Sequence, residues 1–118
     1  MSYDIKFKVK VEGVDAYVEV GDCTANITWN VREIITQSTG LKWNNEENNG
    51  LCIDVIPKIT QGVYELSVHP EKYRHLEARN GCGTVQETKD FFVRILKDWW
   101  MFQKYYPELE KVATFWIV

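Results

Sequence analysis

The chain has 118 residues, of which 45% are hydrophobic and 14% aromatic, and its net charge is −3. This length and composition fit one folded domain and exclude a disordered chain. The basic excess of nucleic-acid-binding domains is missing, and no apolar run approaches the roughly 18 residues that cross a bilayer, so neither nucleic acid nor a membrane is an expected partner.

The N-terminal part of the chain predicts a β-hairpin. Apolar and charged residues alternate over residues 3–11 and apolar residues recur at every second position over 14–20, which is the period of a strand. With a turn at residues 12–13, both faces of the hairpin agree with a single register. The predicted cross-strand pairs are Lys6 with Glu19, Lys10 with Asp15, and Phe7 with Val18. The clustered lysines therefore have acidic partners, and we interpret them as a solvated sheet face.

Two helices are predicted in the middle of the chain. A short helix over residues 31–39 would begin after Asn30, which suits an N-cap, and end at Gly40 in a left-handed conformation. Apolar residues spaced by four predict a second helix over 51–67. Pro57 leaves an alternative open, a strand before the proline and a helix from it, because proline removes an amide donor.

The longest predicted helix begins with Thr84 and Glu87 as a capping box and ends near Pro107. Its regular apolar stripe indicates packing in the core. Residues 111–118 read as a strand that has to be buried beside the hairpin. We therefore predict one α+β domain over residues 1–118, in which a small antiparallel sheet (N-terminal hairpin plus C-terminal strand) packs against the long C-terminal helix and shorter helices, in the order β-β-α-α-α-β.

The cysteines and histidines carry no recognisable catalytic or metal pattern. Three cysteines and two histidines are spaced as in no metal or redox motif, which favours reduced thiols in a cytoplasm. Cys82 is the cysteine in a loop expected to be exposed, with His75 seven residues upstream as a coincidental neighbour. We expect no catalytic residue, no bound metal and no cofactor.

The first candidate binding loop runs from Trp43 to Gly50. Its amide side chains could bond a base edge or ribose hydroxyls, and its tryptophan could stack on a ring. Glu46 and Glu47 would repel a phosphate, so they would lie at the neutral end of a ligand. The alternative is a solvated turn with asparagines in left-handed positions. The candidate ligand residues of this loop are Trp43, Asn44, Asn45, Asn48 and Asn49.

The second candidate loop, residues 79–84, leads into the long helix. Its two glycines allow a close backbone approach, and the free amides of a helix N-terminus together with an arginine are typical of an anion site. The pattern matches neither the P-loop nor the dinucleotide fingerprint, and a flexible turn is the alternative. The candidate ligand residues are Arg79, Asn80, Gly81, Gly83 and Thr84, with Arg32 expected to meet a phosphate as well.

The chain carries the segments ANITWNVREII (25–35), NNGLCIDVIP (48–57) and GCGTV (81–85). Together these resemble a small family of uncharacterised proteins from phages and prophages of Gram-positive bacteria. The resemblance implies a phage setting and the host cytoplasm, and it brings no catalytic residues. Small phage proteins of this size include sponges for nucleotide signals such as cyclic ADP-ribose isomers or cyclic dinucleotides, which is an analogy and not a motif match.

We therefore predict a non-enzymatic phage protein that binds and sequesters a nucleotide-derived host immune signal and so inhibits anti-phage defence. The alternative is a protein–protein inhibitor or phage assembly factor that acts through exposed aromatic residues such as Trp100 or Tyr105. An enzyme that degrades a signal nucleotide is the third hypothesis. A homodimer is compatible with so aromatic a chain.

Overall fold

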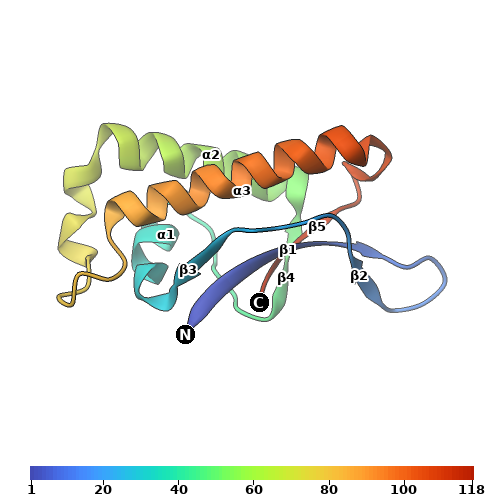
Figure 1. Cartoon of the computed structure of the whole chain (residues 1–118), viewed down its shortest axis with the longest axis horizontal. Coiled ribbons are helices and arrows are strands. Elements are labelled where there is room, and N and C mark those ends of the chain that lie inside the picture. The colour runs from blue at the N-terminus through green and yellow to red at the C-terminus, as the bar shows by residue number, and fades with distance from the viewer.

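Two long helices lie across one face of an antiparallel sheet in the computed structural model, which describes residues 1–118 (Figure 1). The strands are β1 (Ser2–Lys10), β2 (Tyr17–Glu19), β3 (Asn26–Thr28), β4 (Glu47–Leu51) and β5 (Thr114–Ile117). The helices are α1 (Arg32–Thr39), α2 (Cys52–Val68) and α3 (Val85–Tyr105), with 3-10 turns at Trp29–Val31, Pro70–Lys72, Arg74–Leu76 and Pro107–Leu109. The predicted α+β class is confirmed.

The C-terminal strand lies inside the sheet. The strand order is β2-β1-β5-β4, and β3 pairs with the first residues of β1. The prediction that the C-terminal strand pairs beside the hairpin is confirmed. The sequence did not predict β3 or β4, because β3 has three residues and the ENNGL segment of β4 has weak strand propensity. Pairing with a neighbouring strand holds both in place.

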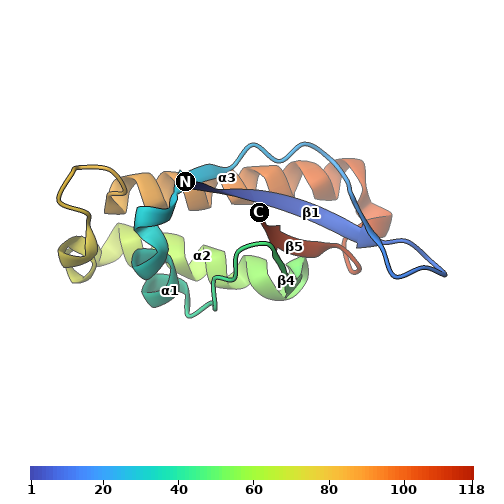
Figure 2. The ribbon, with the colours of Figure 1, turned by 90° about the horizontal axis from the view of Figure 1, so that it is seen from below.

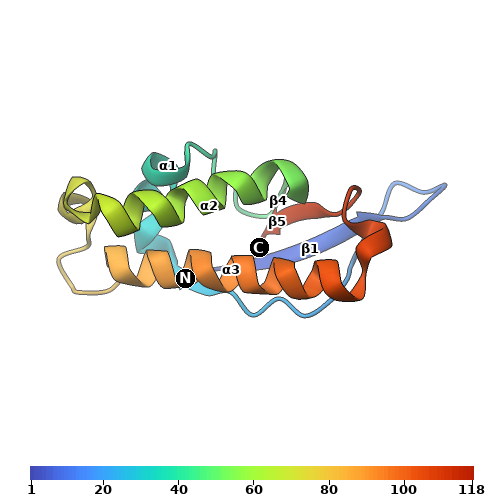
Figure 3. The ribbon, with the colours of Figure 1, turned by 90° about the horizontal axis from the view of Figure 1, so that it is seen from above.

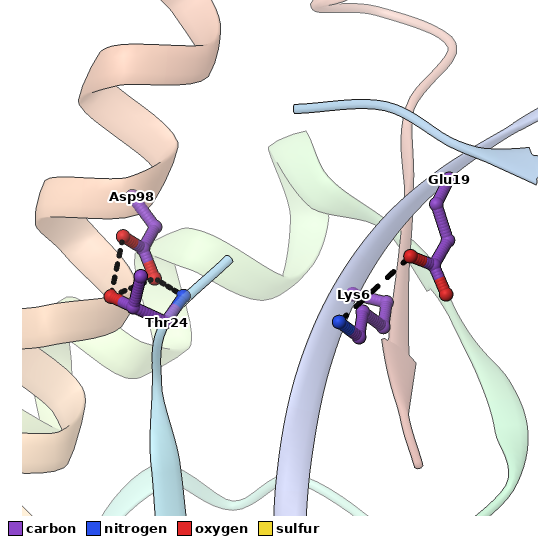
Figure 4. A network of polar contacts seen from close by, with 4 residues as sticks. All are labelled: Lys6, Glu19, Thr24 and Asp98. Carbon is purple, nitrogen blue, oxygen red and sulfur yellow. Dashed lines mark hydrogen bonds and ion pairs between the residues drawn. The ribbon is translucent and has the colours of Figure 1, made fainter. Parts of the chain in front are cut away.

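The predicted register of the hairpin is wrong by two residues. Lys8 pairs with Glu19 and Val9 with Val18, because Val11 N–H bonds the Ala16 carbonyl at 2.8 Å and the connection is longer than a two-residue turn. A shift of two keeps every side chain on its predicted face. Both expected ion pairs are present as diagonal contacts, Lys6–Glu19 at 3.8 Å (Figure 4) and Lys10–Asp15 at 3.9 Å.

The middle helices follow the predicted pattern with one exception. The continuous helix is confirmed as α2, and the alternative of a strand before Pro57 is wrong; the proline ring lies on an exposed face of the helix. α1 ends at Gly40 with a φ of 74°, as expected. It begins one residue later than predicted, and Asn30 is not its N-cap, because residues 29–31 form a 3-10 turn without a side-chain cap.

Aromatic residues fill the space between the helices and the sheet. Phe7 of β1 packs edge-on against Trp99 and Phe102 of α3, with ring centroids 5.4 and 5.5 Å apart. Figure 3 shows α2 and α3 side by side over the sheet, and Figure 2 shows its other face without a covering helix. On that open face the Lys8 ammonium lies 4.3 Å from the Trp116 ring centroid.

Candidate functional site

Trp43 lies in the core, so the prediction that it stacks on a ligand is wrong. Only 1% of its surface is exposed. Its ring contacts Tyr3, Phe91 and Phe115, with centroid separations of 5.7, 6.0 and 6.1 Å. A tryptophan before a polar run is typical of a loop residue, but here its indole lies between the sheet and α3, just before the residues that lead into β4.

The asparagines of the first loop bond to the loop itself. The Asn49 side chain accepts from Asn44 N–H at 3.3 Å and donates to the carbonyls of Asn44 and Glu47 at 3.0 and 2.9 Å. The Asn48 side chain accepts from Gly50 N–H at 2.9 Å. The residue in the left-handed region is Glu46, with a φ of 61°, and not an asparagine. The amides of Asn48 and Asn49 thus hold the edge strand, and Asn45 Oδ1 is buried without a partner.

The predicted anion seat at the start of α3 is occupied by side chains of the protein. Glu77 Oε2 accepts from Val85 N–H at 2.7 Å, and Thr84 Oγ1 accepts from Glu87 N–H at 3.0 Å. The capping role of Thr84 is therefore confirmed. An incoming phosphate would have to displace the Glu77 carboxylate and approach a second one on Glu87, which opposes anion binding.

The remaining predicted residues of this loop are turn residues. Gly81 and Gly83 have φ values of 78° and 85°, and a Cβ on Gly83 would lie 3.0 Å from side-chain atoms of Asn30 and Val31. The Asn80 side chain accepts from Cys82 N–H at 3.0 Å. Arg79 and Arg32 are exposed and form no ion pair. The two candidate loops line no common pocket, because none of the three pockets contains a residue of 43–50.

The largest pocket is a groove between β3 and the N-terminal half of α3, with a volume of about 520 Å³. Buried Ile27 and Phe91 are its apolar residues, and Arg94 is its only basic side chain. Arg94 forms no ion pair. The other residues that line the groove are polar or small: Thr24, Asn26, Thr28, Cys82, Glu87 and Asp90.

A pocket of about 320 Å³ at Asp90, Val93, Arg94 and Lys97 adjoins the groove. The smallest pocket, of about 180 Å³ and here called the smaller pocket, lies farther along the same flank of α3. A hydrogen-bonded contact between Thr24 and Asp98 lies between the groove and the smaller pocket (Figure 4). Buried Asp98 of α3 accepts from the Thr24 N–H at 2.9 Å and from the Thr24 hydroxyl at 3.2 Å. Thr24 lines the groove and Asp98 lines the smaller pocket. The segment before β3 is thereby fixed along the helix.

The sequence analysis did not predict the pockets along this side of α3, because it considered only the apolar stripe by which the helix packs in the core. The signal was present in the spacing of Glu87, Asp90, Arg94 and Asp98, which lie three or four residues apart and share one side of a helix. Asp98 also interrupts an otherwise apolar stripe. A buried acid in such a stripe needs hydrogen-bond donors from another segment, and here residues 24–25 supply them.

None of the helices is long and apolar enough to cross a membrane. The structure has no group of three or more His, Cys, Asp or Glu side chains arranged to hold a metal ion. The resemblance to phage proteins stays a prediction, because no protein-family model, curated protein or solved structure matches this chain.

Proposed function

We propose that this protein is a non-enzymatic phage protein that sequesters a nucleotide-derived host immune signal, and that the ligand binds in the groove between β3 and α3. The groove supports the proposal through its volume of about 520 Å³, which lies in the usual range for small-molecule sites. This location replaces the two loops that the sequence suggested.

The polar residues of the groove suit one end of a nucleotide. Arg94 has no carboxylate partner within the chain, so its guanidinium is free to bind a phosphate through two parallel hydrogen bonds. The Asn26 side-chain nitrogen already donates to Ser2 Oγ at 3.1 Å and Asp4 Oδ1 at 2.7 Å, which leaves the amide oxygen as an acceptor.

The acidic residues of the groove restrict the class of ligand. Glu87 and Asp90 outnumber the single basic residue, and like charges would repel a ligand with many phosphates. Carboxylates accept well from ribose hydroxyls. We therefore expect a ligand whose phosphates are confined to the neighbourhood of Arg94, with a ribose near the two acids and a base against Ile27 and Phe91.

Native mass spectrometry with a panel of cyclic and linear signalling nucleotides tests the proposal. We expect a mass increment that Arg94→Gln removes and Lys58→Gln retains, because Lys58 is an exposed basic residue of α2 outside the groove. Intact nucleotide should be released on denaturation. The proposal fails if no nucleotide binds, or if Arg94→Gln binds as well as the unchanged protein.

A second candidate, a protein–protein inhibitor, is favoured by one observation on α3. Trp100 and Tyr105 are 60% and 63% exposed, and Lys104 Nζ lies 5.4 and 5.9 Å from their ring centroids. Exposed aromatic residues of this kind often dominate protein interfaces. For this candidate we expect the double substitution Trp100→Ala and Tyr105→Ala to abolish binding of a purified host partner, with Tyr64→Ala on α2 as the matched control.

A further inference from the structure

The smaller pocket lies between the Gly21–Asp22 segment and the C-terminal half of α3, and four of its eight lining residues are aromatic. Phe102 is central, with its ring centroid 5.5 Å from that of Phe7 and 5.4 Å from that of Tyr106. Tyr105 adds a fourth ring at the exposed side. The pocket of about 180 Å³ is thus bounded by rings from both the sheet and the helix.

Gly21 keeps the space above these rings open. Its φ is 77°, a region that side chains rarely adopt, and a Cβ at this position would lie 3.6 Å from ring atoms of Phe102 and of Tyr106. The backbone of residue 21 therefore passes over both rings without a side chain that could fill the pocket.

The charge of the pocket is negative. Asp22 and Asp98 line it, no lysine or arginine does, and neither carboxylate forms an ion pair. Asp98 Oδ2 accepts from the amides of Thr24 and Ala25, whereas Oδ1 accepts only the Thr24 hydroxyl at 3.2 Å. A carboxylate oxygen can accept two hydrogen bonds, so Oδ1 retains capacity for another donor.

The neighbouring Cys23 is affected by this negative charge. Burial raises the pKa of its thiol to about 11, and the charge of Asp98 contributes to the rise. The same carboxylate that disfavours a thiolate favours a cation nearby.

We propose that this pocket binds an alkylammonium group. Ring faces carry partial negative charge and attract ammonium groups, and nearby carboxylates strengthen the attraction. The ammonium could come from a small organic amine or from a lysine side chain of a protein partner, which share this chemistry. The pocket has two carboxylates and, unlike the groove with its Arg94, no basic residue, which opposes phosphate binding. The site is therefore separate from the nucleotide groove, and its test does not depend on the proposed function.

NMR titration of the whole chain with choline chloride tests the site. Its control ligand is 3,3-dimethylbutan-1-ol, the neutral carbon isostere, titrated at the same ionic strength. We expect choline to shift the Met101 methyl resonance and to bind at least about five-fold more tightly than the isostere. Equal binding of the two compounds would mean an apolar pocket without cation selectivity and would overturn the proposal.

Two exposed pocket residues can be changed without disturbing the core. Asp22→Asn and Tyr105→Ala should each weaken choline binding about three-fold or more. The matched controls are Glu12→Gln and Tyr64→Ala, an exposed acid and an exposed aromatic residue outside the pocket. Equal losses in the control variants would place binding elsewhere and contradict the site.

A third titration, with Nα-acetyl-lysine methylamide, distinguishes the two sources. Tighter binding of the lysine derivative than of choline would support a lysine side chain as the occupant. Tighter binding of choline would support a methylated small amine. Failure of both compounds to shift resonances of the pocket would overturn the proposal.

Discussion

Asp98 and Thr24 are 74 residues apart in the chain, yet the Asp98 carboxylate accepts both the amide and the hydroxyl of Thr24 (Figure 4). The contact joins the C-terminal half of α3 to the segment that leads into β3. It also lies between the groove, which Thr24 lines, and the smaller pocket, which Asp98 lines.

Replacing this carboxylate should destabilise the fold. Asp98→Ala leaves the amides of Thr24 and Ala25 without their acceptor, and we expect the free energy of unfolding to fall by about 2–4 kcal/mol. Urea denaturation measures the change. Asp90→Ala is the control, because Asp90 is an exposed acid on the same helix and should cost about 0.5 kcal/mol or less. Equal losses would show that Asp98 is not a structural acceptor.

The hydrogen bond between Glu77 and the first turn of α3 should also stabilise the fold. Glu77→Ala removes the carboxylate that accepts from Val85 N–H, and we expect a loss of about 1–2 kcal/mol from the hydrogen bond and the helix dipole together. Thermal unfolding at neutral pH is a suitable measurement. Glu108→Ala, an exposed acid for which the structure shows no hydrogen bond, should leave the melting temperature nearly unchanged. A stable Glu77→Ala variant would contradict the capping role.

Gly62 of α2 lies against side chains of both α1 and α3. A Cβ there would lie 2.7 Å from Phe92 Cε2 and 2.8 Å from Thr39 Cγ2, distances that require the core to shift. We expect Gly62→Ala to cost about 1–3 kcal/mol despite the better helix propensity of alanine. Gln61→Ala at the neighbouring exposed position is the control and should be neutral or slightly stabilising. A stabilised Gly62→Ala variant would mean that the helices can separate at little cost.

The three cysteines should react at different rates with a thiol reagent at pH 8. The pKa of Cys23 is raised to about 11 and that of Cys52 is raised further, in both cases chiefly by burial. Only the thiolate reacts, and a raised pKa keeps these thiols protonated at pH 8. Cys82 is exposed and should give the one fast phase, which Cys82→Ser should abolish. A fast phase that survives this substitution would show that a buried thiol becomes accessible.

The regular elements could be predicted because their patterns are local. The alternation in β1, the capping box of Thr84 and the stripe of α3 each specify an element without help from the rest of the chain. The elements that were missed depend on partners far away in sequence. β4 has an ENNGL sequence with little strand propensity, and its hydrogen bonds to β5 stabilise the extended conformation that the local sequence does not favour.

The candidate site could not be predicted for a related reason. The polar composition of the loops at 43–50 and 79–84 suggested ligand binding. Composition does not show whether a polar side chain already forms hydrogen bonds within the folded chain. The bonds of Asn49 to its own loop and of Glu77 to α3 become visible only when the chain is folded. The groove at Arg94 arises from the packing of β3 along α3, which no single segment encodes.

The position of β5 has a consequence for how the chain folds. β5 lies between β1 and β4, so β4 is joined to the rest of the sheet only through residues 114–117. During synthesis the ribosome would release the N-terminal strands long before the strand that joins them. The sheet should therefore be completed late, and the contact of β1 with β5, which are far apart in sequence, should make this step slow for a chain of this size.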